Sequence, residues 1–168
     1  GVLPEFQSRG VGRLLKLEQR RLALDTGIRL VEWTFDPLEI RNAWFNIERL
    51  GAVVRRYVLN QYGVTSSTLH AGLPTDRCVA EWYLDSPRVH AILHDERPEP
   101  PVIAARIAVP VSIDTLRRDD PREARAVQSR VSDQFVEASA RGLVVIGFEK
   151  SPEFGTYLLG PWNSPSMP

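Results

Sequence analysis

A glycine-containing turn near the start of the chain has the residue types and spacing to bind an anion. The segment reads Gln7-Ser8-Arg9-Gly10-Val11-Gly12 and opens a predicted helix. The first backbone N–H groups of a helix have no intrahelical partner, and the helix dipole favours negative charge there. Gly10 and Gly12 carry no side chain, so a phosphate can approach the backbone closely. Arg9 and Arg13 flank the turn with positive charge. The segment therefore predicts a pyrophosphate site, with a structural turn that only caps a helix as the alternative.

The elements that position this turn follow from the spacing of apolar residues. Leucines recur at helical spacing as far as Gly27, which predicts a helix over about residues 10–26. Asp36 and Pro37 supply an N-cap and a first-turn proline for a second helix, which Gly51 closes. Runs rich in β-branched and aromatic residues predict strands at residues 28–35, 52–59 and 78–84.

The second part of the chain follows a different pattern. Residues 85–101 are rich in Pro, Glu, Arg and His and predict a surface connection, so we expect residues 1–100 and 101–168 to be separate units. Beyond this connection, Asp120 and Glu123 predict a capping box for a helix at 121–141. Strands are predicted at residues 102–109, 143–149 and 156–159. The predicted fold is α/β of the α+β type, with a mixed, mostly antiparallel sheet, flanking helices and a small β-α-β-β extension.

Composition limits the partners and the location. The chain carries 21 basic and 21 acidic side chains, so no overall charge draws it to nucleic acid or to an anionic membrane surface. No stretch approaches the roughly 20 apolar residues that a membrane span requires. The single cysteine, Cys78, can form neither an internal disulfide nor a multi-thiolate metal site, which favours a reducing compartment. We therefore expect a cytoplasmic protein without a metal, a nucleic-acid partner or a membrane partner.

The segment Gln7-Ser8-Arg9-Gly10-Val11-Gly12 matches the Q/R-x-x-G-x-G/A signature of the GNAT acetyltransferase superfamily, which the chain resembles over about residues 1–60. Val2-Leu3-Pro4-Glu5-Phe6 stands where that family has a strand ending in a V-x-P-like sequence. The runs 36–37, 41–46 and 69–77 are similar to one branch of the family. The resemblance implies a GNAT-like fold and acetyl-CoA as cosubstrate.

The resemblance also implies which residues contact acetyl-CoA. Backbone groups of a continuous segment would hold the pyrophosphate: Gln7, Ser8, Arg9, Gly10, Val11, Gly12 and Arg13. The strand backbone at Val2 would pair with the pantetheine arm. Asn42, near the start of the second helix, could hydrogen-bond the same arm, and an exposed helix position explains it equally well.

The chain departs from the family at the position of the general acid. Many members place a Tyr four residues before the glycine that ends the second helix, where its hydroxyl protonates the departing thiolate. Ile47 stands at that position here. Asn46 is adjacent, and Tyr57 and Tyr62 lie downstream, so the catalytic residues are unassigned.

A second departure concerns the elements that precede the signature in the family and supply much of the acceptor site. The sequence begins after them. We expect either that the chain is a piece of a longer protein or that another chain completes the sheet, as a second copy would in a homo-oligomer.

Two carboxylates near the expected cofactor cleft are acid–base candidates. Asp36 ends the strand at 28–35, yet its position before Pro37 predicts an N-cap. Glu32 lies within an otherwise apolar strand, where an acid must be paired or must face a cleft.

The histidines have both functional and structural interpretations. His70 lies in a loop near Asp76 and could exchange a proton with a substrate, or could hold its own turn. His90 and His94 have the spacing of a two-histidine metal pair. The prolines around them argue against a helix and favour a solvated linker.

The apolar positions of the strand at 78–84 indicate a core role. Cys78 alternates with Ala80, Trp82 and Leu84, which predicts a buried structural thiol rather than a nucleophile. We expect three tryptophans to pack the core: Trp33, Trp44 and Trp82.

The resemblance implies an acyltransferase in which an amine, on a small molecule or a peptide, attacks the thioester of acetyl-CoA directly. No covalent enzyme intermediate is required, because the helix N-terminus and the strand backbone position the cosubstrate. The first alternative is a non-catalytic acyl-CoA-binding or regulatory module, which the missing Tyr favours. The second is an interaction domain whose glycine turn only caps a helix.

Overall fold

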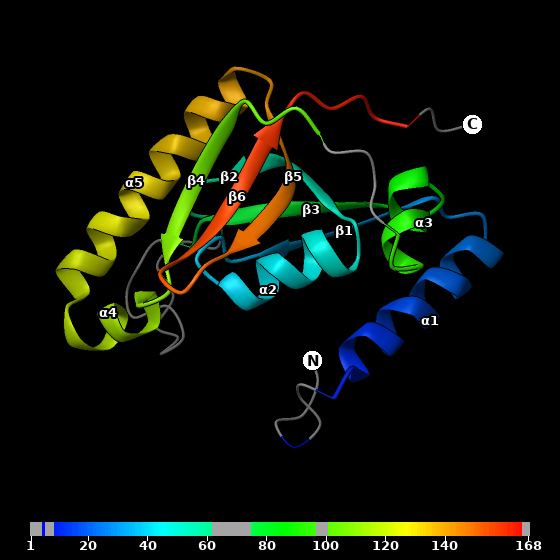
Figure 1. The fold of residues 1–168 in the computed structure, drawn as a ribbon, viewed down its shortest axis with the longest axis horizontal. Helices are drawn as coiled ribbons and strands as arrows, with labels where there is room; N and C mark the ends of the chain where they lie inside the picture. Colours follow the sequence, from blue (N-terminus) through cyan, green and yellow to red (C-terminus); the bar gives the residue numbers. More distant parts are fainter. Residues whose placement is uncertain (1–4, 6–8, 62–74, 97–100, 166–168) are drawn as a thin grey trace.

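The computed structural model describes residues 5, 9–61, 75–96 and 101–165. Its strands form one six-stranded sheet of order β1-β3-β2-β5-β6-β4 (Figure 1). Neighbouring strands run antiparallel throughout this sheet. Helices flank the sheet, so the predicted α+β class with a mostly antiparallel sheet is confirmed.

The elements before residue 100 are three strands and the helices between them: α1 (Val11–Asp25), β1 (Leu30–Phe35), α2 (Ile40–Trp44), the π-helical turn η2 (Phe45–Arg49), β2 (Val53–Val58), β3 (Arg77–Tyr83) and α3 (Pro87–Leu93). β3 lies between β1 and β2 and is buried on both faces. Cys78 and Trp82 point into the main core, while Tyr83 joins a smaller cluster with Val53 and Ile146. The predicted alternation of β3 and the buried thiol are thus confirmed.

The elements after residue 100 are β4 (Ala105–Pro110), α4 (Ile113–Asp119), α5 (Pro121–Ala140), β5 (Val144–Lys150) and β6 (Phe154–Gly160). Asp120 caps α5 as predicted, because its Oδ1 accepts from the Glu123 N–H at 3.1 Å. α5 lies along the sheet beside β4, while α1 and α3 lie at the opposite end (Figure 1). The buried stripe of α5 includes Ala124, Val127, Val131 and Phe135, which fall three and four residues apart.

The two three-stranded halves of the sheet meet weakly at β2 and β5. The two strands share one registered pair, Val54 with Val145. The register of β2 against β3 shifts between Val54 and Arg56, and that of β5 against β6 shifts between Val145 and Gly147. Such bulges interrupt a ladder and increase local twist. Both halves nevertheless belong to one sheet, and the division into units at about residue 100 stays a prediction.

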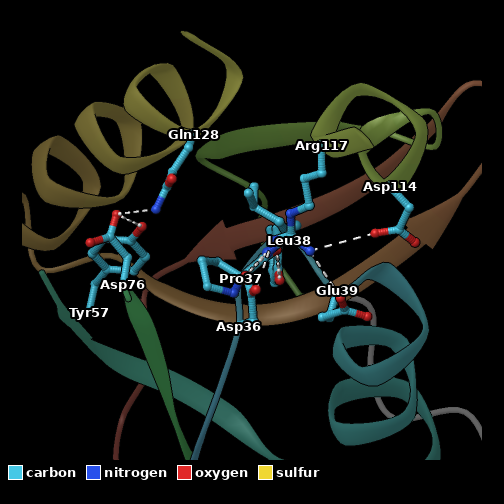
Figure 2. A network of polar contacts seen from close by, with 10 residues as sticks. Asp36, Pro37, Leu38, Glu39, Tyr57, Asp76, Asp114, Arg117 and Gln128 are labelled. Carbon is cyan, nitrogen blue, oxygen red and sulfur yellow. Dashed lines mark hydrogen bonds and ion pairs between the residues drawn. The ribbon is translucent and has the colours of Figure 1, made fainter. Parts of the chain in front are cut away.

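Buried polar contacts supplement the weak junction between the halves. Arg117 of α4 donates to the Asp36 carboxylate at 2.8 Å and to the Glu39 carboxylate at 3.1 Å (Figure 2). The Tyr157 hydroxyl of β6 donates to the Pro37 carbonyl at 2.6 Å. The connection between β1 and α2 is therefore held by side chains from the second half of the chain.

These contacts explain why the predicted N-cap role of Asp36 was wrong. α2 begins at Ile40, and Glu39 precedes it without a side-chain cap. One Asp36 oxygen accepts from the Leu38 N–H at 2.8 Å and closes a short turn, while the other faces Arg117. The helix therefore starts later than the local sequence predicts.

The predicted surface connection at 85–101 was also partly wrong, because it contains α3. Ser86 accepts from the Val89 N–H at 3.3 Å, and Pro87 occupies the first turn. This cap and proline are a helix-start signal that the abundance of polar residues obscured. α4, which precedes the cap of α5, was likewise not predicted from the sequence.

Replacing Arg117 by Met should lower the free energy of unfolding by about 3 kcal/mol, because it leaves the Asp36 carboxylate, whose side chain is 14% exposed, without its cation. Chemical denaturation at neutral pH measures this change. The exposed neighbour Arg118, on the same short helix, provides the matched control. Its replacement by Met should change stability by less than about 0.5 kcal/mol. Equal losses in the two variants would contradict a special role of the Arg117 contacts.

Candidate functional site

The predicted anion-binding turn leads into α1 through a left-handed glycine. Gly10 has φ 80° and is the N-cap of the helix. Its carbonyl accepts from the Arg13 N–H at 3.0 Å and from the Leu14 N–H at 3.1 Å. The N–H groups ahead of Arg13 lie outside the intrahelical ladder. The first turn contains no acidic side chain, and the space beside the Gly10 Cα is open to at least 4 Å. The turn is therefore compatible with a bound phosphate.

The residues predicted to contact the cofactor differ in how the structure places them. Val2, Gln7 and Ser8 lie outside the described residues. Arg9 and Gly10 are exposed, and Val11 and Gly12 are half-buried. Arg13 extends away from the turn, because its Nη2 donates to the Leu93 carbonyl of α3 at 3.0 Å. Its guanidinium thus links two helices, and the contribution of all these residues to cofactor binding stays a prediction.

Charged side chains attach α1 to the sheet. Ala23 alone is buried among the residues of this helix. Lys16 Nζ lies 3.5 Å from the centre of the Trp33 ring on β1, and Arg20 Nε donates to the Leu84 carbonyl at 2.8 Å. Leu14 is 65% exposed and Leu15 is 57% exposed. The leucine spacing therefore predicted the helix correctly, but it did not predict which residues of the helix are buried.

The asparagine predicted to contact the pantetheine arm belongs to a pair on the second helix. Asn42 is exposed on α2, and its Oδ1 accepts from the Asn46 Nδ2 at 3.4 Å. Asn46 is buried within the π-helical turn η2. Single π-helical turns are frequent at functional sites. This contact uses the Asn42 oxygen, so the Asn42 amide N–H groups can serve as donors to a carbonyl ligand.

The position of the family's general acid lies inside the core. Ile47 is fully buried and packs within the main apolar cluster. Tyr57 is engaged elsewhere, because its hydroxyl lies 2.9 Å from Ser132 Oγ and 3.3 Å from the Asp76 carboxylate. Burial raises the pKa of Tyr57, so its phenol is a poor acid near neutral pH. Tyr62 lies outside the described residues, and the general acid stays unassigned.

Asp76 is the centre of a buried network that the sequence analysis missed (Figure 2). Its Oδ2 accepts from Ser132 Oγ at 2.5 Å and from Gln128 Nε2 at 3.3 Å. Its Oδ1 accepts from the Asn60 N–H at 2.9 Å. The carboxylate is therefore well supplied with donors and has a structural role. Ser132 and Gln128 lie more than 50 residues away in sequence, so no local pattern indicated the contact.

The remaining carboxylates of the first strands are paired with arginines. Glu32 forms an ion pair with Arg56, as an acid in an apolar strand requires. Glu81, which the sequence analysis did not single out, is fully buried. It accepts from Arg55 Nε at 2.6 Å and from the Tyr83 hydroxyl at 2.8 Å. The sequence signal for this buried acid was the pair of consecutive arginines, Arg55 and Arg56, within a predicted strand. The bulge in β2 lets both arginines face Glu81.

His90 belongs to α3, and His94 ends that helix, so the expected linker is helical here. Their rings stack with centres 6.3 Å apart, and His90 Nε2 lies 3.1 Å from Asp85 Oδ1. The hydrogen bond from His90 and the charge of Arg29 lower the pKa of Asp85. Within the described ranges, no three His, Cys, Asp or Glu residues form a metal-ligand group. His70 lies outside those ranges.

The thiol and the tryptophans occupy the core positions that their spacing predicted. Burial raises the pKa of Cys78 well above its usual value, which disfavours a thiolate nucleophile. Trp82 is fully buried, and Trp33 and Trp44 pack partly buried against the same core.

No protein-family model, curated protein or solved structure matches the chain in sequence or structure comparisons. The GNAT resemblance therefore stays a prediction. Among the helices of the described segments, none combines the length and apolar character needed to cross a membrane.

The free energy of unfolding should fall as the pH rises above about 10, because the unfolded chain ionises Tyr57 near the usual tyrosine pKa. Burial raises the pKa of Tyr57 in the folded chain, so its stabilising contribution is complete below pH 10 and decreases above it. Denaturation curves between about pH 8 and pH 11 measure the slope. A Tyr57→Phe variant should lose about 1 kcal/mol at neutral pH and show a shallower alkaline decrease. An unchanged slope in that variant would exclude Tyr57 as its source.

Proposed function

We propose that the chain binds acetyl-CoA at the Gly10 turn and transfers the acetyl group to an amine. The observation that carries the proposal is the left-handed Gly10 at the open N-terminus of α1, within the Gln7–Gly12 signature. A Cβ would narrow the approach to the backbone there, and an acidic first turn would repel an anion. The chain has neither feature, which supports a pyrophosphate as the ligand.

In this proposal, the N–H groups at Gly10, Val11 and Gly12 hold the pyrophosphate, and the Asn42 side chain donates to the pantetheine arm. The acceptor amine attacks the thioester carbonyl while the cosubstrate is held in position. The carbon–sulfur bond then breaks, and the thiolate takes up a proton. Because a thiol has a pKa of about 8.5, the thiolate can leave without a strong general acid.

The proposed acceptor is an uncharged primary amine on a small molecule or a peptide. The proposal places the protein in the cytoplasm, where a single unpaired cysteine stays reduced. It includes no metal, no nucleic acid and no membrane partner. A second copy in a homo-oligomer would complete the sheet at β1, the terminal strand on that side.

A specific observation favours a second candidate, a non-catalytic acyl-CoA-binding or regulatory module. The position expected for the general acid is the buried Ile47, and the next described tyrosine along the chain, Tyr57, is held in the Asp76 network. A binding module requires no acid or base, so these features do not oppose it.

Isothermal titration of acetyl-CoA into the chain and into a Gly10→Glu variant should show binding that the variant loses by at least about tenfold. The new carboxylate would repel the pyrophosphate at the same position. Gly27→Glu is the matched control, because Gly27 has the same φ of 80° and open surroundings at the other end of α1. Equal losses in both variants, or no binding by the parent chain, would contradict the proposal.

Release of free coenzyme A in the presence of a panel of primary amines then separates the two candidates. Amine-dependent release that Gly10→Glu abolishes supports an acyltransferase. Tight binding without amine-dependent release supports the binding module.

A further inference from the structure

His90 lies where α3 meets α1, and one nitrogen of its ring has a hydrogen-bond donor on one side and an acceptor on the other. Its Nε2 is 3.3 Å from Arg20 Nη2 of α1 and 3.1 Å from Asp85 Oδ1, in the turn before α3. A guanidinium only donates hydrogen bonds, and a carboxylate only accepts them. Since Nε2 carries either a lone pair or a proton, it can hydrogen-bond only one of these two neighbours at a time.

Charged and titratable groups face His90 from every element around it in the described part of the chain. Arg20 approaches from α1, while Arg29, from the connection between α1 and β1, donates to Asp85 Oδ2 at 2.6 Å. His94, at the end of α3, stacks on the His90 ring and donates from Nδ1 to the His90 carbonyl at 2.8 Å. Contact with His90 and the charge of Arg29 lower the pKa of Asp85, so this carboxylate stays ionised where histidines titrate.

The neutral ring suits the contact with Arg20. With a lone pair on Nε2, His90 accepts from Arg20 and thereby links α3 to α1. A protonated ring instead places a second positive charge beside the guanidinium, which repels it, and directs the Nε2 proton to Asp85. Protonation therefore exchanges a contact between two helices for one inside residues 85–90.

This exchange affects α1 because the helix has few other attachments. Ala23 is its one buried residue. Arg20 Nε also donates to the Leu84 carbonyl at 2.8 Å, and Arg13 Nη2 donates to the Leu93 carbonyl at 3.0 Å. Exposed polar contacts are each weak, so a helix held by a small number of them opens more often when one is lost.

We propose that His90 is a pH-sensitive clasp between α1 and α3. Above the pH range in which histidine titrates, neutral His90 accepts from Arg20 and holds the two helices together. On acidification, Nε2 takes a proton from solvent, donates to Asp85 and releases Arg20, and α1 is then held less tightly. This inference does not depend on acetyl-CoA binding.

Hydrogen exchange of the α1 backbone amides in the full chain tests the clasp at about pH 7.5 and about pH 5.5. After correction for the intrinsic effect of pH on exchange, protection should fall about fivefold at the lower pH, the change expected for one hydrogen bond. His90→Gln should show equal protection at both values, because its amide can accept from Arg20 and donate to Asp85 without titrating. His94→Gln is the control and should retain the loss.

The ¹⁵N chemical shifts of the His90 ring report which nitrogen carries the proton. At about pH 7.5, Nε2 should have the shift of an unprotonated nitrogen, and Arg20→Met should move the proton onto Nε2. A protonated Nε2 in the parent chain at that pH would overturn the inference. Equal protection of α1 at both pH values, or an unchanged loss in His90→Gln, would overturn it as well and would leave the proposed function in place.

Discussion

The junction between β2 and β5 is the constraint on which the rest of the structure depends. One registered pair, Val54 with Val145, connects the two three-stranded halves of the sheet, and a register shift follows in each strand. So short a ladder leaves backbone groups that need other partners. The Phe148 N–H, for example, donates to the Glu48 carboxylate at 2.7 Å. Polar side chains therefore form hydrogen bonds between the two halves of the sheet that a longer ladder would otherwise supply.

This requirement explains where the polar residues of the interior are used. Asp36 and Arg117 join β1 to α4, and Asp76 joins the start of β3 to Ser132 on α5. Each contact crosses from the first part of the chain to the second. The carboxylates of Asp36 and Asp76 therefore hold the two halves of the sheet together. At α1, by contrast, the space beside Gly10 is open, and Lys16 contacts a tryptophan ring.

Local signals predicted much of the fold. The Asp120 cap and its proline located α5, and the alternation around Trp82 located β3 and its buried thiol. Sequence reasoning failed where distant contacts override local preference. Asp36 has the sequence of an N-cap, but Arg117, 81 positions away, takes one of its oxygens.

At the candidate site, too, sequence reasoning predicted local features but not contacts between distant elements. The glycines predicted a turn that opens α1, because only local residues were involved, and Gly10 in that turn has φ 80°. It could not foresee that Arg13 would reach Leu93 on α3, since that contact depends on how two helices pack. It also did not identify the buried Glu81, because the consecutive arginines indicate a partner acid without indicating which one, and the bulge in β2 decides that.

The central claim is that the N-terminal turn of α1 holds the pyrophosphate of acetyl-CoA. Its most direct test is the change in backbone amide ¹H–¹⁵N chemical shifts when acetyl-CoA is added to the isotopically labelled chain. The account predicts that the largest shifts occur at Gly10, Val11 and Gly12, with smaller shifts at the C-terminal end of α1. Shifts concentrated elsewhere, or none at saturating acetyl-CoA, would contradict it.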